Sequence, residues 1–229
     1  MLHDFKNRPA GRLVPVFAAS DGLQDCDLCL RLSKAAASLG ETVLLLDAKD
    51  GLMMKTAGII YNKTLGDVLY RDAPLKDAQY ITANEHFTAA ACGDAPLEDV
   101  LGSLATLSLS YDWVFVATET GCTPAHVRLS AAADTSILTY GSEGDKFMRA
   151  YWMMDAIRAR HPKFDPLILS SGPRSESVES AVMLTETVRE FLGAPPPYAG
   201  HFDDTHLEMR LLDQMRDITP NTAIAKTAS

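Results

Sequence analysis

The stretch LVPVFAASDGLQDCDLCLRLSKAAASLGETVLLLDA, residues 13–48, determines the fold class of this 229-residue chain. Its two apolar runs, residues 13–19 and 42–47, are predicted to be strands that are buried on both faces, because neither alternates apolar with polar side chains. Between them, residues 25–39 place leucine and alanine at helical spacing, and Gly40 follows where a helix would end. A strand, a helix and a second strand in this order predict a parallel pair joined by a crossover helix.

The same alternation of strand-like and helix-like segments continues along the chain. It predicts an α/β fold with a mostly parallel sheet flanked by helices on both faces, in one domain over residues 1–220 with a frayed tail over residues 221–229. Pro15 lacks the N–H that a strand ladder uses, so the first strand is predicted to be bulged. The further strands are expected at residues 87–91, 112–117, 135–140, 166–170 and 198–201, and the further helices at residues 96–109, 123–133, 143–160, 176–192 and 204–215.

The composition excludes several classes of protein. With 30 acidic against 21 basic residues the formal net charge is -9, so we expect neither nucleic acid nor an anionic membrane surface as a partner. No apolar run approaches the roughly 18 residues that span a bilayer, so no stable membrane insertion is expected. The first residues lack the pattern of a secretion signal, and four cysteines are too few for a disulfide framework. We therefore expect a cytoplasmic protein.

Four short motifs occur in an order that is typical of one protein family. VLLLDA at residues 43–48 follows the first helix, LGDVL stands at residues 65–69, DWVFVATETG at residues 112–121 and AADTSIL at residues 132–138. Together they resemble the MinD/ParA family of deviant P-loop ATPases, whose members read strand, SGKGGVGKS/T, helix, glycine, VLLLDAD and later YDxhhhDxPxG, where h is apolar. LGDVL and AADTSIL are most similar to the stretches in MinD and in the flagellar-number regulators FlhG and FleN. The resemblance covers residues 12–220 and implies a P-loop NTPase fold.

The resemblance also marks a degenerate nucleotide site. A P-loop uses glycines that turn backbone amides toward the phosphates, a lysine for the terminal phosphoryl group and a hydroxyl for magnesium. Counting back from Gly40 without gaps, Asp25 stands where the family has this lysine and Cys26 where it has the hydroxyl, while Ala117 replaces the aspartate that orders magnesium. At the remaining positions, Ser20 replaces the lysine that reaches across a dimer, Asp21 and Gln24 replace glycines, Lys49 replaces the switch aspartate, and Gly22 and Asp47 are kept.

Charge decides what these exchanges mean for ATP. An anion in place of a cation about 4 Å from a phosphate turns an attraction into a repulsion of roughly 4 kcal/mol at an effective dielectric constant of about 20. We therefore expect a non-catalytic pseudo-ATPase with no nucleotide cofactor and no metal. The resemblance implies a protein-interaction or regulatory module of bacterial flagellar placement or number, cell division or partitioning, with a protein partner. The sequence leaves the oligomeric state open, and if the pseudo-ATPase forms a homodimer, we expect it to form without nucleotide. The alternative is a switch that binds ATP or ADP with magnesium through an unconventional loop, using Lys49 or Lys55.

A second alternative is a dithiol redox protein. Cys26 and Cys29 form a CxxC pair at the start of a helix that follows a strand, where the helix N-terminus would stabilise a thiolate. Asp25 and Asp27 argue against this function, because neighbouring negative charges raise the pKa of a thiol. A buried pair of small apolar side chains is the simpler interpretation. A zinc site that joins this pair to Cys92 and Cys122 has no support from the spacing.

Other polar and amphipathic segments have simple interpretations. Residues 201–206, HFDDTH, gather two histidines and two carboxylates that could bind a metal, but Asp203 or Asp204 is expected to cap the helix that follows. Glu119 is a lone carboxylate near a strand end and is expected to be a loop residue. Residues 206–218 are amphipathic but not basic, so attachment to a membrane surface is not expected.

Overall fold

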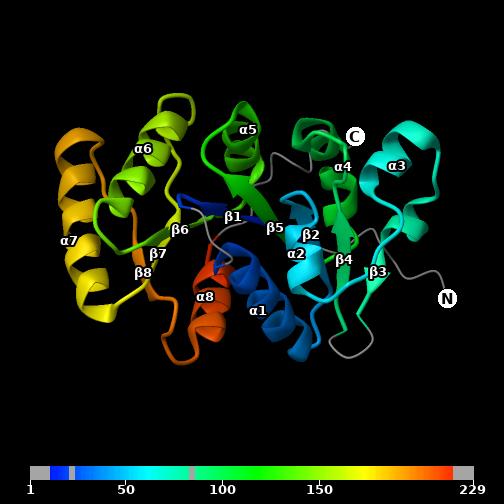
Figure 1. Cartoon of the computed structure of the whole chain (residues 1–229), viewed down its shortest axis with the longest axis horizontal. Helices are drawn as coiled ribbons and strands as arrows, with labels where there is room; N and C mark the ends of the chain where they lie inside the picture. Colours follow the sequence, from blue (N-terminus) through cyan, green and yellow to red (C-terminus); the bar gives the residue numbers. More distant parts are fainter. Residues whose placement is uncertain (1–10, 21–23, 83–85, 219–229) are drawn as a thin grey trace.

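The computed structural model describes residues 11–20, 24–82 and 86–218. An eight-stranded sheet runs through this part in the order β3-β4-β2-β5-β1-β6-β7-β8 (Figure 1). Neighbouring strands are parallel, except that β3 and β4 are antiparallel. The strands are β1 (Arg12–Ala18), β2 (Val43–Ala48), β3 (Tyr80–Ile81), β4 (Thr88–Ala91), β5 (Trp113–Thr120), β6 (Ile137–Gly141), β7 (Leu167–Ser171) and β8 (Tyr198–His201).

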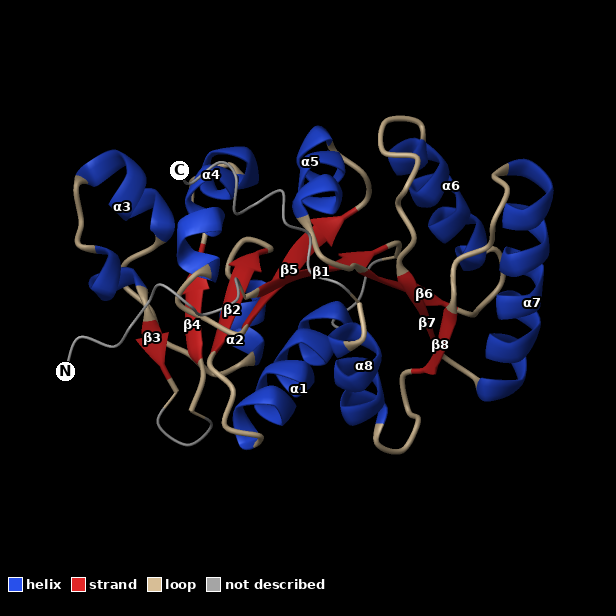
Figure 2. Ribbon diagram, turned by 180° about the vertical axis from the view of Figure 1, so that it is seen from behind, coloured by secondary structure: helices blue, strands red, loops and turns tan. Residues whose placement is uncertain are grey.

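Helices cover both faces of the sheet. Figures 1 and 2 show α3, α4, α5, α6 and α7 on one face and α1, α2 and α8 on the other. The predicted fold class, a mostly parallel sheet between two layers of helices, is confirmed. The helices are α1 (Gln24–Ser38), α2 (Leu52–Thr56), α3 (Leu65–Arg71), α4 (Leu97–Ser108), α5 (Pro124–Ala132), α6 (Lys146–Arg158), α7 (Arg174–Phe191) and α8 (Leu207–Arg216), and a short 3-10 helix, η2, spans Leu75–Ala78.

Alternate residues of each central strand enter two separate hydrophobic cores. On β2, Leu44 and Leu46 belong to one core, and Val43 and Leu45 belong to the other, with at most 1% of each residue exposed. Burying a leucine or valine side chain contributes roughly 1.5–3 kcal/mol. The continuous apolar sequence of β2 is therefore explained by burial on both of its faces.

Several short elements escape the sequence patterns. The segments β3, α2, α3 and η2 have two to seven residues each, which is too few to show a periodicity. The sequence signals α3 only through its capping box, in which Thr64 and Asp67 bond to each other's backbone N–H. The predicted strand end at Ala117 is also wrong, because β5 continues to Thr120.

The predicted irregularity of the first strand is confirmed, but it does not lie at Pro15, which keeps its register with β5. The irregularity of β1 lies after it, between Val16 and Ala18. β1 begins to pair with β6 only at Val16. Before that point the Asp134 carboxylate accepts the Leu13 N–H at 2.7 Å. The missing donor of Pro15 thus falls on a stretch of β1 that does not yet need a ladder bond to β6.

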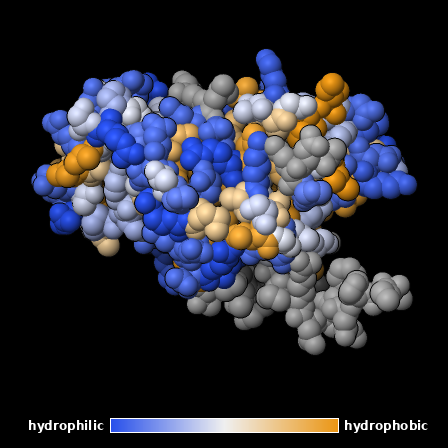
Figure 3. Space-filling view, turned by 90° about the horizontal axis from the view of Figure 1, so that it is seen from below, coloured by the Kyte–Doolittle hydropathy of each residue, from blue (hydrophilic) through white to orange (hydrophobic). Residues whose placement is uncertain are grey.

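The amphipathic helix α8 keeps its apolar side inside the molecule. Leu207, Leu211, Leu212 and Met215 are each 0% exposed and share a core with side chains of α1. Figure 3 shows a mainly hydrophilic surface on the side of the molecule that α1 and α8 cover. The apolar side chains of α8 are therefore used in the core of the molecule. Among the described helices, none has the length and apolar character needed to cross a membrane.

Candidate functional site

The predicted site lies where the carboxyl ends of β2, β5 and β1 are neighbours in the middle of the sheet. Because these strands are parallel, the loops that follow them meet at one edge, which is where open α/β sheets bind ligands. Asp21 and Gly22 of the prediction lie outside the described residues, as does the predicted tail, residues 221–229. The other predicted residues are Ser20, Gln24, Asp25 and Cys26 after β1, Asp47 and Lys49 at the end of β2, and Ala117 in β5.

Asp25 and Lys49 form a buried ion pair at this edge. The Lys49 Nζ lies 2.8 Å from the Asp25 Oδ1 and 2.7 Å from its Oδ2. The Asp25 side chain is 1% exposed and the Lys49 side chain 11%, so water screens the pair little. Asp25 belongs to the first turn of α1, where the helix dipole favours a negative charge. A carboxylate of the chain, with its own cation, therefore stands at the helix N-terminus, where P-loop proteins hold a phosphate.

On the predicted alignment with the family pattern, the two charges have exchanged places. Asp25 stands at the position of the loop lysine and Lys49 at the position of the switch aspartate, and the fold brings the two side chains into contact. The sequence predicts each replacement but not their pairing, because the two residues belong to different segments, the start of α1 and the turn after β2. Lys49 would have to leave Asp25 to reach a phosphate, and Lys55 lies on the surface of α2.

The thiols of the CxxC pair are buried in the core beneath α1. Cys26 and Cys29 are each 0% exposed and belong to the same hydrophobic cluster. Burial, and then the charge of Asp25, raises the pKa of the Cys26 thiol to about 12, and the same causes raise the pKa of Cys29 well above its ordinary value. Both thiols stay protonated, so this site favours neither redox chemistry nor a magnesium ligand at Cys26.

The retained aspartate, Asp47, organises the turn between β2 and α2. Its Oδ1 accepts the Lys49 N–H at 2.8 Å and its Oδ2 accepts the Met54 N–H at 2.9 Å. The residue is 1% exposed, and burial raises the pKa of its carboxyl, opposed by these backbone hydrogen bonds. Both oxygens are thus used to hold backbone, and this turn sets the position of Lys49 beside Asp25.

Ser20 and Ala117 have local structural roles. The Ser20 Oγ accepts the Gly141 N–H at 3.2 Å, which ties the end of β1 to the end of β6, and Ser20 is only 9% exposed. A residue so buried does not reach across a dimer as the family's lysine does. Ala117 is 0% exposed and sits inside β5, paired with Val16 on one side and Asp47 on the other.

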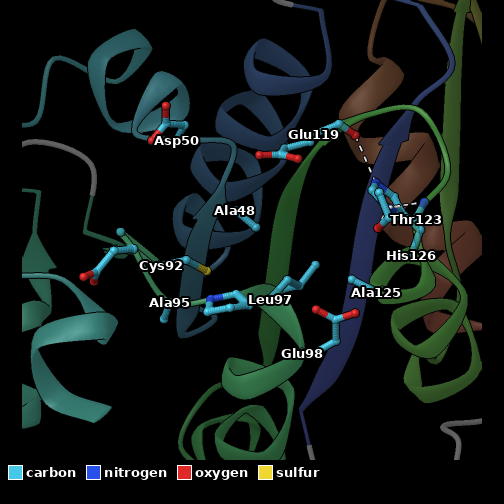
Figure 4. A pocket seen from close by; sticks show the side chains of 13 residues that line it. Ala48, Asp50, Cys92, Ala95, Leu97, Glu98, Glu119, Thr123, Ala125 and His126 are labelled. Atoms are coloured by element: carbon cyan, nitrogen blue, oxygen red, sulfur yellow. Dashed lines mark hydrogen bonds between the residues drawn. The ribbon is translucent and has the colours of Figure 1, made fainter. Parts of the chain in front are cut away.

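A pocket of about 400 Å³ opens beside this site, at the ends of β2, β4 and β5. Figure 4 shows Glu119 and Glu98 entering it from different elements. Glu119 lies within β5, so its expected place in a loop is wrong. Asp50 and Asp94 also line the pocket, which gives it four carboxylates. The sequence does not reveal this cluster, because its members come from four separate segments.

His126 is the only basic side chain among the described residues that line the pocket. Its Nδ1 accepts the Thr123 N–H at 3.2 Å, and its Nε2 lies 3.0 Å from the Glu119 carbonyl oxygen (Figure 4). These partners require a neutral ring with the proton on Nε2. Burial lowers the pKa of His126, which agrees with this assignment. The pocket therefore presents carboxylates without a compensating cation from its own histidine.

The HFDDTH segment is held together by local hydrogen bonds. The His201 Nε2 lies 2.8 Å from the Gly172 carbonyl oxygen, and its Nδ1 accepts the Asp203 N–H at 3.1 Å. Asp204 accepts from the His201 N–H and from Arg210 rather than capping α8, whose N-cap is His206, so that expectation is wrong. In the described part of the chain, no group of three or more histidine, cysteine, aspartate or glutamate side chains is placed to hold a metal.

No protein-family model matches the chain, and no curated protein matches its sequence. Solved structures do match it. A chain of the MinC:MinD cell division protein complex of Aquifex aeolicus has 19% identity and a TM-score of 0.69, over 94% of this chain and 89% of that one. MinD of Pyrococcus horikoshii OT3 complexed with Mg-ADP has 19% identity and a TM-score of 0.65, over 83% and 80%. Apo McdA of Cyanothece has 14% identity and a TM-score of 0.65, over 89% and 90%.

These likenesses define the class of protein to which the fold corresponds. The chain has the fold of the MinD/ParA P-loop ATPases, as the order of its motifs predicts. At these identities the likeness concerns the fold alone, and the chemistry of the site has to be argued from its own residues.

Proposed function

We propose that this chain is a pseudo-ATPase, a MinD/ParA-type scaffold that has lost nucleotide binding and acts as a protein-interaction or regulatory module. The buried ion pair between Asp25 and Lys49 is the observation that carries the proposal. It places an anion at the helix N-terminus and engages the cation that would otherwise be nearest to a phosphate.

The energetic argument follows from the burial of Asp25. Phosphate binding would have to draw Lys49 away and leave a carboxylate that is 1% exposed without its partner. Breaking a buried pair in this way costs roughly 3–5 kcal/mol. That cost alone corresponds to a loss of affinity of roughly 150- to 5,000-fold. The four carboxylates of the neighbouring pocket add repulsion of the same sign.

The residues also do not fit a magnesium ion bound to nucleotide. The hydroxyl position is Cys26, a buried and protonated thiol, and the position of the magnesium-ordering aspartate is Ala117, which has no polar group. The retained Asp47 uses both oxygens on backbone N–H groups. We therefore assign no step of catalysis to this site.

The biological role is proposed by analogy with proteins of the same fold. Their names include a cell division protein, MinD, and a plasmid partition protein of Borrelia burgdorferi. We place this chain in the cytoplasm, in bacterial cell organisation such as division, partitioning or flagellar placement or number. It would act there through a protein partner and, where it dimerises, without nucleotide.

The test is a calorimetric titration of the chain with magnesium ATP and with magnesium ADP. MinD of Pyrococcus horikoshii, which is known in complex with Mg-ADP, serves as the positive control. We expect no binding heat up to millimolar nucleotide. Micromolar affinity for either nucleotide would overturn the proposal and favour the alternative of a switch with an unconventional loop.

Sedimentation with and without magnesium ATP gives an independent readout. We expect the same distribution of monomer and dimer in both samples, because no ligand bridges the two copies. A shift from monomer to dimer on addition of ATP would contradict the proposal even where the affinity is too weak for calorimetry.

A further inference from the structure

Residues of α3, η2 and α4 line an apolar groove. Figure 2 shows α3 and α4 on the face of the sheet opposite α1. Its volume is about 300 Å³. Two of its leucines, Leu69 and Leu75, are each 38% exposed, so a substantial apolar area faces solvent. The side chains and backbone that line this α3–α4 groove are those of Leu65, Val68, Leu69, Leu75, Val100, Gly102, Ser103 and Leu107.

The groove is open because α4 carries small residues at its centre. A Cβ atom built on Gly102 would meet no other atom within 4 Å, so this glycine is not needed for close packing. The opposite wall is fixed by polar contacts that join α3 to α4 and to the loop before it. The Tyr70 hydroxyl donates to the Asp99 carboxylate, and the Arg71 guanidinium binds Asp94. These contacts fix the position of α3 relative to α4.

The segments that line the α3–α4 groove contain more acidic than basic residues. Between residues 64 and 107, the described part of the chain has six carboxylates but only two lysine or arginine side chains, Arg71 and Lys76. Arg71 is engaged by Asp94 and Asp67. An occupant with positive charges beside its apolar side chains would therefore be favoured over a neutral or acidic one. The six carboxylates are those of Asp67, Asp72, Asp77, Asp94, Glu98 and Asp99.

We infer that the α3–α4 groove binds an amphipathic helix of a partner protein, with apolar residues at i, i+3, i+4 and i+7 and with lysine or arginine on its flanks. A groove between two helices, lined by aliphatic side chains, fits the helix-in-groove mode of recognition. The net negative charge of the segments that line the groove favours a cationic partner helix. This inference does not depend on whether the chain binds nucleotide, because the α3–α4 groove contains none of the predicted site residues.

The probe is a designed, fluorescently labelled helix of about 14 residues, or roughly four turns. One version has leucine at i, i+3, i+4 and i+7 with lysine elsewhere. The control version has glutamate in place of lysine. Fluorescence anisotropy with the full chain measures both. We expect the leucine–lysine helix to bind at least about tenfold more tightly than the leucine–glutamate helix, and its affinity to fall as salt is added.

Matched variants locate the binding. Leu69→Gln combined with Leu75→Gln removes exposed apolar side chains of the groove and is expected to weaken the leucine–lysine helix at least about tenfold. Val178→Gln combined with Val182→Gln makes a similar change on α7, where these valines are 66% and 51% exposed, and should leave binding within about twofold. Asp72→Asn combined with Asp77→Asn should reduce the salt dependence, and asparagine tolerates the left-handed backbone of Asp72.

Several results would overturn the inference. Equal binding of the two helices would remove the charge argument, and an equal loss in the α7 variant would show that the helix binds any exposed apolar surface. Sedimentation of the variant with both Leu69→Gln and Leu75→Gln tests whether a second copy of the chain, rather than a partner helix, fills the groove. If the native chain is a dimer that this variant dissolves, then a second copy fills the α3–α4 groove and a partner helix does not.

Discussion

Replacement of Lys49 by methionine tests the ion pair on which the proposed function depends. Methionine keeps an unbranched apolar stem but removes the ammonium group that lies 2.7 Å from the Asp25 carboxylate. Asp25 is then left with a negative charge at a position where its side chain is 1% exposed. Removing one partner of a buried pair typically costs 3–5 kcal/mol, roughly a third or more of the stability of an ordinary domain.

The expected size of the effect can be measured in two ways. Urea unfolding at neutral pH should show a decrease of about 3–5 kcal/mol in the free energy of unfolding. For a chain of this length the melting temperature should fall by about 2–4 °C per kcal/mol, or roughly 6–20 °C in total. Lys55→Met is the matched control, because Lys55 is exposed on α2 and its loss should change stability by less than about 0.5 kcal/mol.

A double variant makes the test specific for the ion pair. Asp25→Asn combined with Lys49→Met removes the uncompensated charge, so it should be more stable than Lys49→Met alone. A purely packing role for Lys49 predicts the opposite, with the two losses adding. A cost of less than about 1 kcal/mol for Lys49→Met, or additive losses in the double variant, would refute the reasoning about this pair.

Three further outcomes are expected. Asp25→Lys alone should not restore calorimetric binding of magnesium ATP, because the hydroxyl and the magnesium-ordering aspartate are also missing; measurable affinity would contradict this. In alkylation followed by mass spectrometry of the native chain, Cys122, which is exposed, should react while Cys26 and Cys29 stay unmodified, since burial raises their pKa and blocks access; equal labelling would contradict it. Burial lowers the folded-state pKa of His126 below its ordinary value of 6.5, so the unfolded chain binds more protons there and stability should fall as pH decreases below about 6.5. His126→Gln keeps a capping-box residue on α5 and should lose part of this slope in urea unfolding, and an unchanged slope would count against the assignment.

The sequence predicts the sheet well because its strands are buried on both faces. Uninterrupted runs such as residues 43–48 identify central strands, and the helices between them show clear periodicity. It fails where an element is too short to have a period, as in β3 and α2, or where a strand outlasts its apolar run. β5 continues through polar residues to Thr120, because its neighbour β1 still offers backbone partners there. A single sequence shows which side chains are buried, but it does not show which strands pair through their backbones.

The candidate site is likewise only partly predictable from the sequence. Family spacing identifies Asp25 and Lys49 as replacements, one by one, because each can be counted from a fixed motif. Their contact depends on the order of the strands in the sheet. The parallel neighbours β1, β5 and β2 bring the start of α1 and the turn after β2 to one edge, and the spacing of residues in the sequence does not record this order. The acidic pocket beside them is not predictable from the sequence, because Asp50 and Glu119 come from different segments, a turn and the end of β5, and belong to no motif of their own.

The proposed charge exchange would allow the fold to be kept without a nucleotide ligand. In a P-loop protein the free amides at the start of the first helix are satisfied by a phosphate, so stability increases with ligand concentration. In this chain the carboxylate of Asp25 is an anion that belongs to the chain itself and therefore cannot leave the site. The ammonium group of Lys49, from the turn after β2, balances its charge. Under the proposed function, the stability of this edge of the sheet does not depend on nucleotide. We therefore expect millimolar magnesium ATP to leave the melting temperature unchanged in differential scanning fluorimetry, whereas a rise that saturates with nucleotide concentration would mean that the internal carboxylate yields to a phosphate.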